Sequence, residues 1–218
     1  MEINENPTTT QSISKSAVGI GLFAVLSAAV IAITQVTTVD RIDANVREAE
    51  SKALYEIFPA SIDEQLYDHR IELDAGQLNV ETGTTGYQAI QNDQVVGVIL
   101  PVTSSQGYSG DIDLIVGINA DSSIAGVRVI SHKETPGLGD KIDRAKSDWI
   151  ESFRGTRRQG QDDSNWAVKK DGGQFDQFTG ATITPRAVVK ATSVALDYFE
   201  THKNLLLSPA NREKSYAE

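Results

Sequence analysis

No cysteine occurs anywhere in the sequence. Disulfide bonds, thiolate catalysis and iron–sulfur clusters held by cysteine are therefore excluded for this chain. Histidine is scarce as well: three residues lie about 60 to 70 positions apart, a spacing that predicts no metal site. Basic residues are outnumbered 20 to 30, and a net charge of −10 argues against a nucleic-acid partner, since a phosphate backbone demands a basic surface. The content of 39% hydrophobic and 23% charged residues is that of a globular protein.

Charged residues are also absent from one long stretch, residues 16–39, SAVGIGLFAVLSAAVIAITQVTTV. About twenty apolar residues span the core of a bilayer as a helix, so this run predicts a transmembrane anchor. One alternative is a cleaved signal peptide, but its apolar region is usually only about 7 to 15 residues long. The other alternative is a buried core helix, which is less compatible with a run that no polar face interrupts.

The chain is accordingly divided into a polar N-terminal tail (1–15), the anchor (16–39), one folded domain (40–208) and a flexible tail (209–218). Basic residues flank the anchor on both sides, so their distribution leaves its orientation ambiguous. Long domains cross membranes largely regardless of charge. We therefore expect a single-pass protein of the bacterial inner membrane whose folded domain lies in the periplasm.

Residue patterns in the body predict an α+β fold. Apolar residues at helical spacing end in a helix stop at Pro59. Short strand patterns follow at 71–73, 86–90, 95–100, 112–118 and 124–131, with turns at 91–94 and 119–123. A helix is expected at 140–153, then a polar loop (155–174) with a solvated basic cluster, and a last helix from Pro185 to about Leu207 with Thr184 as its N-cap. Strands followed by helices without strict alternation indicate antiparallel strands packed with helices.

Two short motifs carry the candidate chemistry. The loop 134–139 (ETPGLG) follows a predicted strand, and its glycines allow backbone amides to approach a flat or anionic ligand. The turn 179–182 (TGAT) precedes the last helix, where free N–H groups and the helix dipole favour a phosphate. Taken alone, each motif is equally compatible with an ordinary loop or a helix cap.

Together the motifs resemble those of a known family. Residues 176–182 (DQFTGAT) resemble the flavin-attachment signature of FMN-binding domains, and residues 134–139 resemble the flavin loop of the same domains. The segment 107–111 (GYSGD) and the single N-terminal span also fit. Their order and spacing are similar to those of the G subunits of Rnf (Rsx) electron transport complexes, over about residues 15 to 205.

The resemblance implies one FMN per chain, esterified through its phosphate to Thr182. The phosphate end would be lined by Thr179, Gly180 and Ala181. The flavin ring would be contacted by Glu134, Thr135, Gly137, Leu138 and Tyr108. The resemblance implies neither a catalytic residue nor a bound metal, because the redox chemistry is that of the flavin.

The implied function is a membrane-anchored electron relay in an ion-translocating ferredoxin/NAD oxidoreductase. Its implied partners are the other membrane and iron–sulfur subunits of the complex, membrane lipid, and a flavin transferase that uses FAD as the FMN donor and recognises Asp176. Within the family, the C subunit of the sodium-translocating NADH:quinone reductase is the alternative. Outside redox chemistry, the alternatives are an anchored binding or regulatory module for an anionic ligand and a structural tether.

Overall fold

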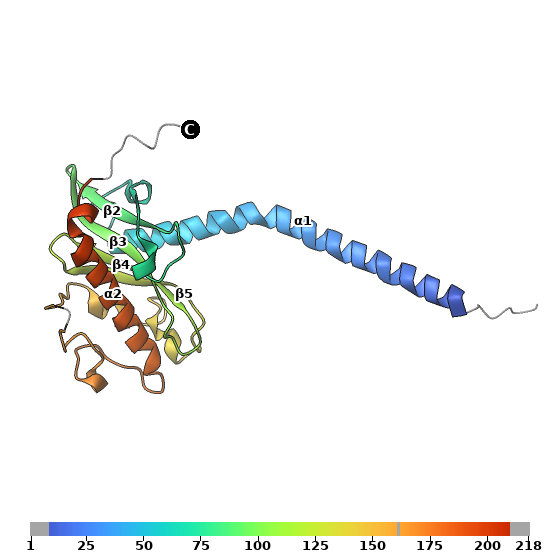
Figure 1. Cartoon of the computed structure of the whole chain (residues 1–218). Helices are drawn as coiled ribbons and strands as arrows, with labels where there is room; N and C mark the ends of the chain where they lie inside the picture. Colours follow the sequence, from blue (N-terminus) through green and yellow to red (C-terminus); the bar gives the residue numbers. More distant parts are fainter. Residues whose placement is uncertain (1–8, 161, 210–218) are drawn as a thin grey trace, which may run out of the picture. The chain divides into compact units, whose positions relative to one another are not determined.

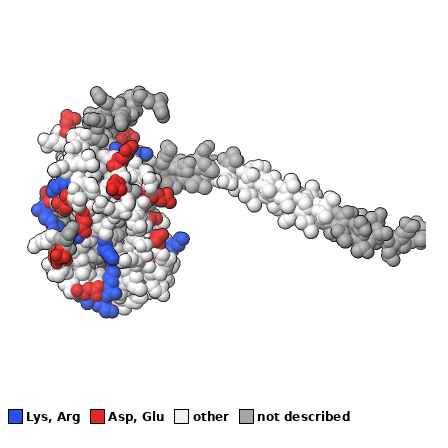
Figure 2. Space-filling model, in the orientation of Figure 1, with Lys and Arg blue, Asp and Glu red and all other residues white. Residues whose placement is uncertain are grey.

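The computed structural model describes residues 9–160 and 162–209, which fall into two compact units divided between Ala49 and Glu50. Helix α1 (Thr9–Ile57) crosses this division: its residues up to Ala49 belong to the first unit, and its residues 50–57 belong to the second. Within α1, Ala17–Gln35 has a mean hydropathy of 2.4 and none of it is buried. Figure 2 shows this part of the helix without any Lys, Arg, Asp or Glu. The predicted apolar helix is confirmed, and it is long and apolar enough to cross a membrane.

Threonine hydroxyls near the end of this apolar stretch find partners within the helix. Thr34 donates to the carbonyl of Val30 at 2.8 Å, and Thr37 donates to that of Ile33 at 2.9 Å. Thr38 repeats the pattern on Thr34 at 2.7 Å. A hydroxyl without a hydrogen-bond partner is costly in an apolar medium. Because each of the three threonines bonds to a backbone carbonyl of the helix, their side chains are compatible with an apolar medium.

Five antiparallel strands form one sheet in the order β1-β2-β3-β4-β5. They are β1 (Arg70–Glu72), β2 (Thr85–Gln91), β3 (Gln94–Ser104), β4 (Ile112–Asn119) and β5 (Ile124–His132). All five predicted strands are present, and the α+β class is confirmed. The turn between β2 and β3 is tight, because Asn92 and Asp93 take φ values of 51° and 61°, which suit a two-residue hairpin.

Helix α2 (Ile183–Leu206) covers one face of the sheet (Figure 1). Its buried stripe, which includes Val188 and Phe199, packs with alternate residues of β3 and β4 such as Val98 and Val116. The far end of α2 is held by the buried Gln88 of β2, whose amide donates to the carbonyls of Leu206 and Ser208 at 2.7 Å. These bonds satisfy carbonyls that a helix C-terminus leaves without partners.

The opposite face of the sheet is covered by the end of α1 and the segment after it. Leu54, Ile57 and Phe58 are buried there with the intervening sheet residues, among them Ile99 and Ile115. Three glycines on neighbouring strands, Gly97, Gly117 and Gly126, form what we call the glycine groove. A Cβ atom on Gly97 would lie 2.4 Å from the Phe58 ring, and one on Gly117 would lie 2.1 Å from the Ile57 side chain. The end of α1 and Phe58 therefore approach the sheet more closely than alanine at Gly97 or Gly117 would allow.

An ion-pair network ties the same helix end to the edge of the sheet. Arg128 of β5 is buried and bonds to Glu56 at 2.7 Å and to Glu151 at 2.6 Å. Glu151 also pairs with Arg144 and Arg154, both at 3.1 Å. Partial burial disfavours the charged form of Glu151, but the hydrogen bond from Arg154 and the charges of Arg128, Arg154 and Arg144 keep the pKa of this carboxyl below its usual value.

The prediction of one α-helix at 140–153 is wrong. Two 3-10 helices replace it, η3 (Gly139–Ile142) and η4 (Asp148–Phe153). Asp143 is extended between them, and its carboxylate accepts from the N–H of Ala145 at 2.9 Å. Ser147 is also extended, and its hydroxyl accepts from the N–H of Trp149 at 3.1 Å. Such local side-chain bonds compete with the helical backbone ladder.

The strand predicted at 95–100 continues through Pro101 to Ser104. The pairing between β2 and β3 extends only as far as Tyr87 and Ile99. Beyond Ile99, β3 pairs with β4 alone. Pro101 is tolerated there because its missing N–H breaks no bond to β2.

Candidate functional site

The topology brings the motifs to one end of the sheet. Ser104 pairs with Ile112, and Ile112 pairs with His132. The end of β3, the start of β4 and the end of β5 are therefore neighbours. The β3–β4 loop, which contains Gly107–Asp111, and the loop 134–139 leave the sheet side by side.

Glu134 joins these loops to the start of α2. It is 5% exposed, and one carboxylate oxygen accepts from the N–H of Ser109 at 2.9 Å. The other oxygen accepts from the hydroxyl of Thr184, which is fully buried. Two motif segments and the first turn of α2, which directly follows the third motif, thus converge on one buried carboxylate.

Two glycines allow this convergence. A Cβ atom on Gly107 would lie 2.9 Å from one Glu134 carboxylate oxygen, and a Cβ on Gly139 would lie 2.7 Å from the other. Side chains at these positions would displace Glu134 from its partners. The predicted contact between Glu134 and a flavin ring stays a prediction; in the structure both of its carboxylate oxygens accept hydrogen bonds from within the protein, and these bonds link the two loops to the start of α2.

The loop 134–139 also lies beside the predicted attachment turn. The carbonyl of Thr135 closes the loop by accepting from the N–H groups of Leu138 and Gly139, both at 3.1 Å. A Cβ atom built on Gly180 would lie 3.6 Å from the Leu138 side chain. Gly180 has a φ of 83°, a left-handed conformation that favours glycine. The predicted flavin loop and the predicted phosphate turn are therefore neighbours, although Gly139 and Thr179 lie 40 positions apart in the sequence.

Helix α2 begins earlier than expected. Ile183 is its first residue and Thr182 precedes it, so the predictions of Thr184 as N-cap and Pro185 as first residue are wrong. Pro185 occupies the third helical position, where the first turn still requires no N–H donor. Thr182 has helical backbone angles (φ −78°, ψ −25°), and its hydroxyl forms no capping bond. The predicted attachment residue thus stands at the N-terminus of a 24-residue helix, where the dipole favours an anion.

Aromatic packing fixes the segment that leads into the turn. The indole N–H of Trp149 in η4 donates to the carbonyl of Asp176 at 2.8 Å, and the ring meets Phe178 edge-on at 5.1 Å. Phe153 stacks on Phe175 with 4.3 Å between ring centres. The turn itself closes when Ala181 donates its N–H to Phe178 at 3.2 Å. The sequence pattern predicted a helix over this part of the chain but gave no link between Trp149 and the motif.

Most residues around the turn 179–182 are exposed to solvent, and several of them are apolar. The side chains of Tyr108, Leu138 and Ile183 are 70%, 43% and 46% exposed. Thr135, Gly137, Thr179 and Gly180 are exposed, and Ala181 and Thr182 are half-buried. A flat apolar ligand would therefore find uncovered apolar side chains beside a helix N-terminus.

Charged side chains frame the attachment segment. Asp176 pairs with Lys169 at 2.6 Å, and both are exposed. Arg186, in the first turn of α2, binds Asp171 through two hydrogen bonds of 2.6 and 2.7 Å. This hydrogen bonding holds the pKa of Asp171 below its usual value. Asp176, the predicted recognition residue for a transferase, is accessible on the surface.

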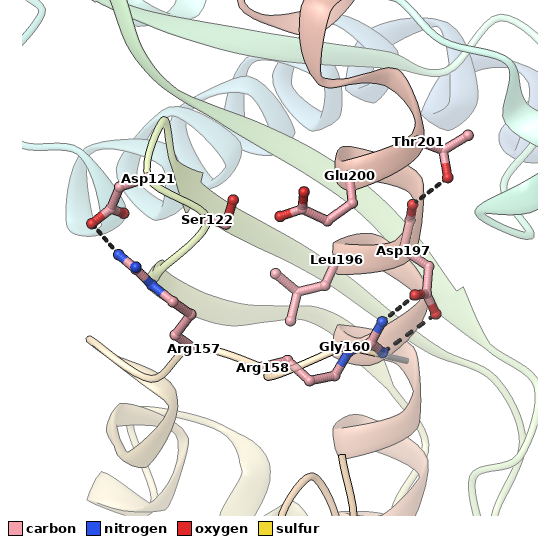
Figure 3. Close-up of a pocket in the computed structure, with 9 residues that line it drawn as sticks. All are labelled: Asp121, Ser122, Arg157, Arg158, Gly160, Leu196, Asp197, Glu200 and Thr201. Carbon is pink, nitrogen blue, oxygen red and sulfur yellow. Dashed lines mark hydrogen bonds and ion pairs between the residues drawn. The ribbon is translucent and has the colours of Figure 1, made fainter. Parts of the chain in front are cut away.

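A cavity of about 560 Å³ lies away from this site, at residues 121–122, 157–160 and 196–201 (Figure 3). Arg157 pairs there with Asp121, and Arg158 pairs with Asp197 and Ser193. The Arg158 side chain is 7% exposed, so this member of the predicted solvated cluster is buried and paired instead. Residues 196–201 begin about 21 Å along α2 from Thr182, at about 1.5 Å per residue. No residue of the three motifs lines the cavity.

Comparisons with known proteins agree with the geometry. Residues 107–197 match the FMN-binding domain family, and residues 1–57 match the RnfG N-terminal region. The described fold and its converging motifs thus define an FMN-binding domain that follows an apolar N-terminal helix.

Relatives along nearly the whole chain narrow this class. The G subunit of the ion-translocating oxidoreductase complex of Shewanella loihica is 44% identical over 209 residues, which cover 94% of this chain and 99% of the relative. The corresponding G subunit of Pseudomonas aeruginosa is 44% identical over 203 residues, 92% of this chain and 95% of the relative. The corresponding G subunit of Aliivibrio fischeri is 42% identical over 205 residues, which cover 93% of this chain and 98% of the relative. The chain belongs to the G-subunit family of Rnf ion-translocating oxidoreductases.

Proposed function

We propose that this chain is a membrane-anchored flavoprotein subunit that relays electrons through one FMN covalently bound to Thr182. The observation that carries the proposal is the convergence of two motif segments and the start of α2 on Glu134, beside a helix N-terminus where the Thr182 hydroxyl forms no capping bond. The G-subunit relatives are named as parts of ion-translocating oxidoreductase complexes. The proposed partners are therefore the other membrane and iron–sulfur subunits of such a complex.

The residues at the site fit FMN. A phosphate at the start of α2 would meet the free N–H groups of Ile183 and Thr184 and the uncrowded turn Thr179–Ala181. The exposed side chains of Tyr108 and Leu138 would cover an apolar ring, with Thr135 and Gly137 at its edge. Glu134 would act behind these loops by holding them in register. When bound, FMN supplies the one- and two-electron chemistry, and the chain supplies position and surroundings.

Covalent attachment requires a transferase that moves FMN from FAD to a hydroxyl. Thr184 is unsuited as acceptor because its hydroxyl is fully buried and donates to Glu134. Thr182 is half-buried and its hydroxyl forms no capping bond. Asp176 is exposed six residues earlier, where an enzyme could recognise it.

Loss of the hydroxyl oxygen tests the attachment residue. Thr182→Val keeps the branching but removes the nucleophile, so covalent flavin should vanish, while Thr182→Ser should retain some attachment. Thr179→Val is the matched control, and it should weaken modification without abolishing it. Each variant is expressed with the transferase, denatured, and examined by in-gel flavin fluorescence and intact mass. The native chain should carry one FMN less one water. Full modification of Thr182→Val would show that another hydroxyl is used, and a wild-type chain without flavin would favour the non-redox binding module.

The membrane anchor is proposed from the apolar stretch Ala17–Gln35 and its self-satisfied threonines. The folded domain would then lie in the periplasm of a bacterium, tethered to the inner membrane by one span. A reporter that is active only in the cytoplasm, fused after Ala217, should remain silent. An active reporter would reverse the topology, and a mature protein beginning near Gln35 would mean that the span is a cleaved signal.

A further inference from the structure

The first turn of α2 has a proline at an uncommon place. Pro185 is the third residue of the helix, it is buried, and it has no N–H. A threonine before a helix ordinarily has an extended backbone, and its oxygen accepts from the N–H of the second or third helical residue. Pro185 removes one of these two donors.

Thr182 lacks the capped arrangement in other respects too. Its backbone angles are helical rather than extended, and its hydroxyl forms no hydrogen bond to the described residues. The remaining donor for a cap is the N–H of Thr184. The hydroxyl of Thr184 is turned to Glu134, so it does not compete for the Thr182 oxygen either.

We propose that Pro185 is a positioning residue for flavin attachment, because it withholds the N–H that would draw the Thr182 hydroxyl into a helix cap. This inference rests on the proposed function. In the attachment step, the Thr182 oxygen forms a bond to the flavin-side phosphorus of FAD, the bond from that phosphorus to the bridging oxygen breaks, AMP leaves, and the hydroxyl proton is released. A capped oxygen has one of its two lone pairs engaged with the helix, which makes it a weaker nucleophile and holds it in the orientation of the cap.

The size of the effect follows from the worth of a cap. Pro185→Ala restores the N–H, and the capped state should then compete with the reactive one. We expect attachment to slow about fivefold, a population change that corresponds to about 1 kcal/mol at an RT of about 0.59 kcal/mol. Val189→Ala is the matched control, since Val189 is 3% exposed, lies one turn further along α2 and also loses buried carbon atoms. It should leave the rate within about twofold of wild type, because it adds no donor at the helix start.

The experiment uses the full-length chain, purified without flavin in detergent and then mixed with the transferase and FAD. The initial rate of attachment is followed by in-gel fluorescence and intact mass. If the wild-type and P185A chains take up flavin equally fast, this inference is overturned and the proposed function is not. Equal slowing of P185A and V189A overturns it as well, because general loosening of α2 would then suffice. A wild-type chain that takes up no flavin overturns the proposed function, and this inference with it.

A second measurement does not depend on the folding of P185A. If the Thr182 hydroxyl is uncommitted while Pro185 is present, Thr182→Val should leave the unfolding temperature of the flavin-free chain unchanged within about 1 °C, because no cap is lost. A fall of several degrees would show that the hydroxyl already caps the helix, which overturns the inference.

Discussion

Gly117→Ala should destabilise the domain, because the glycine groove has no room for a methyl group at this position. The new Cβ would lie 2.1 Å from the Ile57 side chain, roughly 1.5 Å inside an ordinary carbon–carbon contact. Ile57 is 2% exposed and cannot turn away into solvent. Overpacking of this kind costs about 1–3 kcal/mol, which lowers the unfolding temperature of a domain of this size by about 2–4 °C per kcal/mol.

Gly126→Ala is the matched control, because Gly126 is the cross-strand partner of Gly117. Its added Cβ would have its nearest neighbours at 3.3 and 3.4 Å, the closer being the end of the flexible Arg154 side chain. Loss of glycine's backbone freedom offsets the tighter contact, so stability should change by less than about 1 kcal/mol. Scanning calorimetry of the full-length chain in detergent measures both variants.

A double-mutant cycle identifies the source of the strain. Ile57→Ala alone should cost about 2–5 kcal/mol, and adding Gly117→Ala to it should cost little more, because the clashing methyl group is gone. The reasoning is refuted if Gly117→Ala is as stable as wild type, or if its cost is undiminished in the Ile57→Ala background.

Three further changes probe other parts of the structure. Glu134→Gln keeps the shape of the side chain but turns one acceptor oxygen into an N–H donor, so one of the two hydrogen bonds should be lost. Flavin attachment, measured as in-gel flavin fluorescence per chain, should fall while the fold persists, and unchanged attachment would contradict the bracing role. Phe153→Ala should cost about 3–5 kcal/mol, because this ring is fully buried among aromatic neighbours, and urea unfolding would contradict the packing argument if the cost were under about 1 kcal/mol. Because the pKa of Glu151 is lowered in the folded state, its contribution to stability is present above its unfolded value near 4.5 and is lost as the pH falls through the folded value. Glu151→Gln should therefore flatten the acid side of the stability profile, and an unchanged slope below pH 4.5 would contradict the assignment.

The strands could be predicted because their signals are local. The apolar run 95–100 and the Asn92-Asp93 turn are sufficient to define β2 and β3. The turn sets the register only as far as Ile90, because the pairing shifts between Ala89 and Ile90. The break at Asp143 was missed because its cause is a competition between a side chain and the helical ladder, which periodicity does not register. Pro185 was misplaced for a related reason: proline is tolerated throughout the first helical turn, so it marks a helix start only to within a few residues.

The candidate site was only partly predictable. The motifs were found from their own composition, whereas the bond between Glu134 and Thr184 spans 50 residues and the bond from Trp149 to Asp176 spans 27. No local pattern encodes such contacts. A usable signal was nevertheless present for Glu134, since a lone carboxylate beside Gly137 and Gly139 at the end of a strand is well placed for close backbone approach. The sequence could not decide whether that approach is to a ligand or to the protein itself.

The aromatic cluster gives the protein a natural optical reporter. The chain has two tryptophans, Trp149 and Trp166, and the structure places both against the segment that leads into the attachment turn. Apolar helix α1 contains none. Intrinsic tryptophan emission therefore arises next to the predicted attachment segment and from no residue of α1. Under the proposed function it should report on flavin arrival by energy transfer to the yellow chromophore, without any added dye.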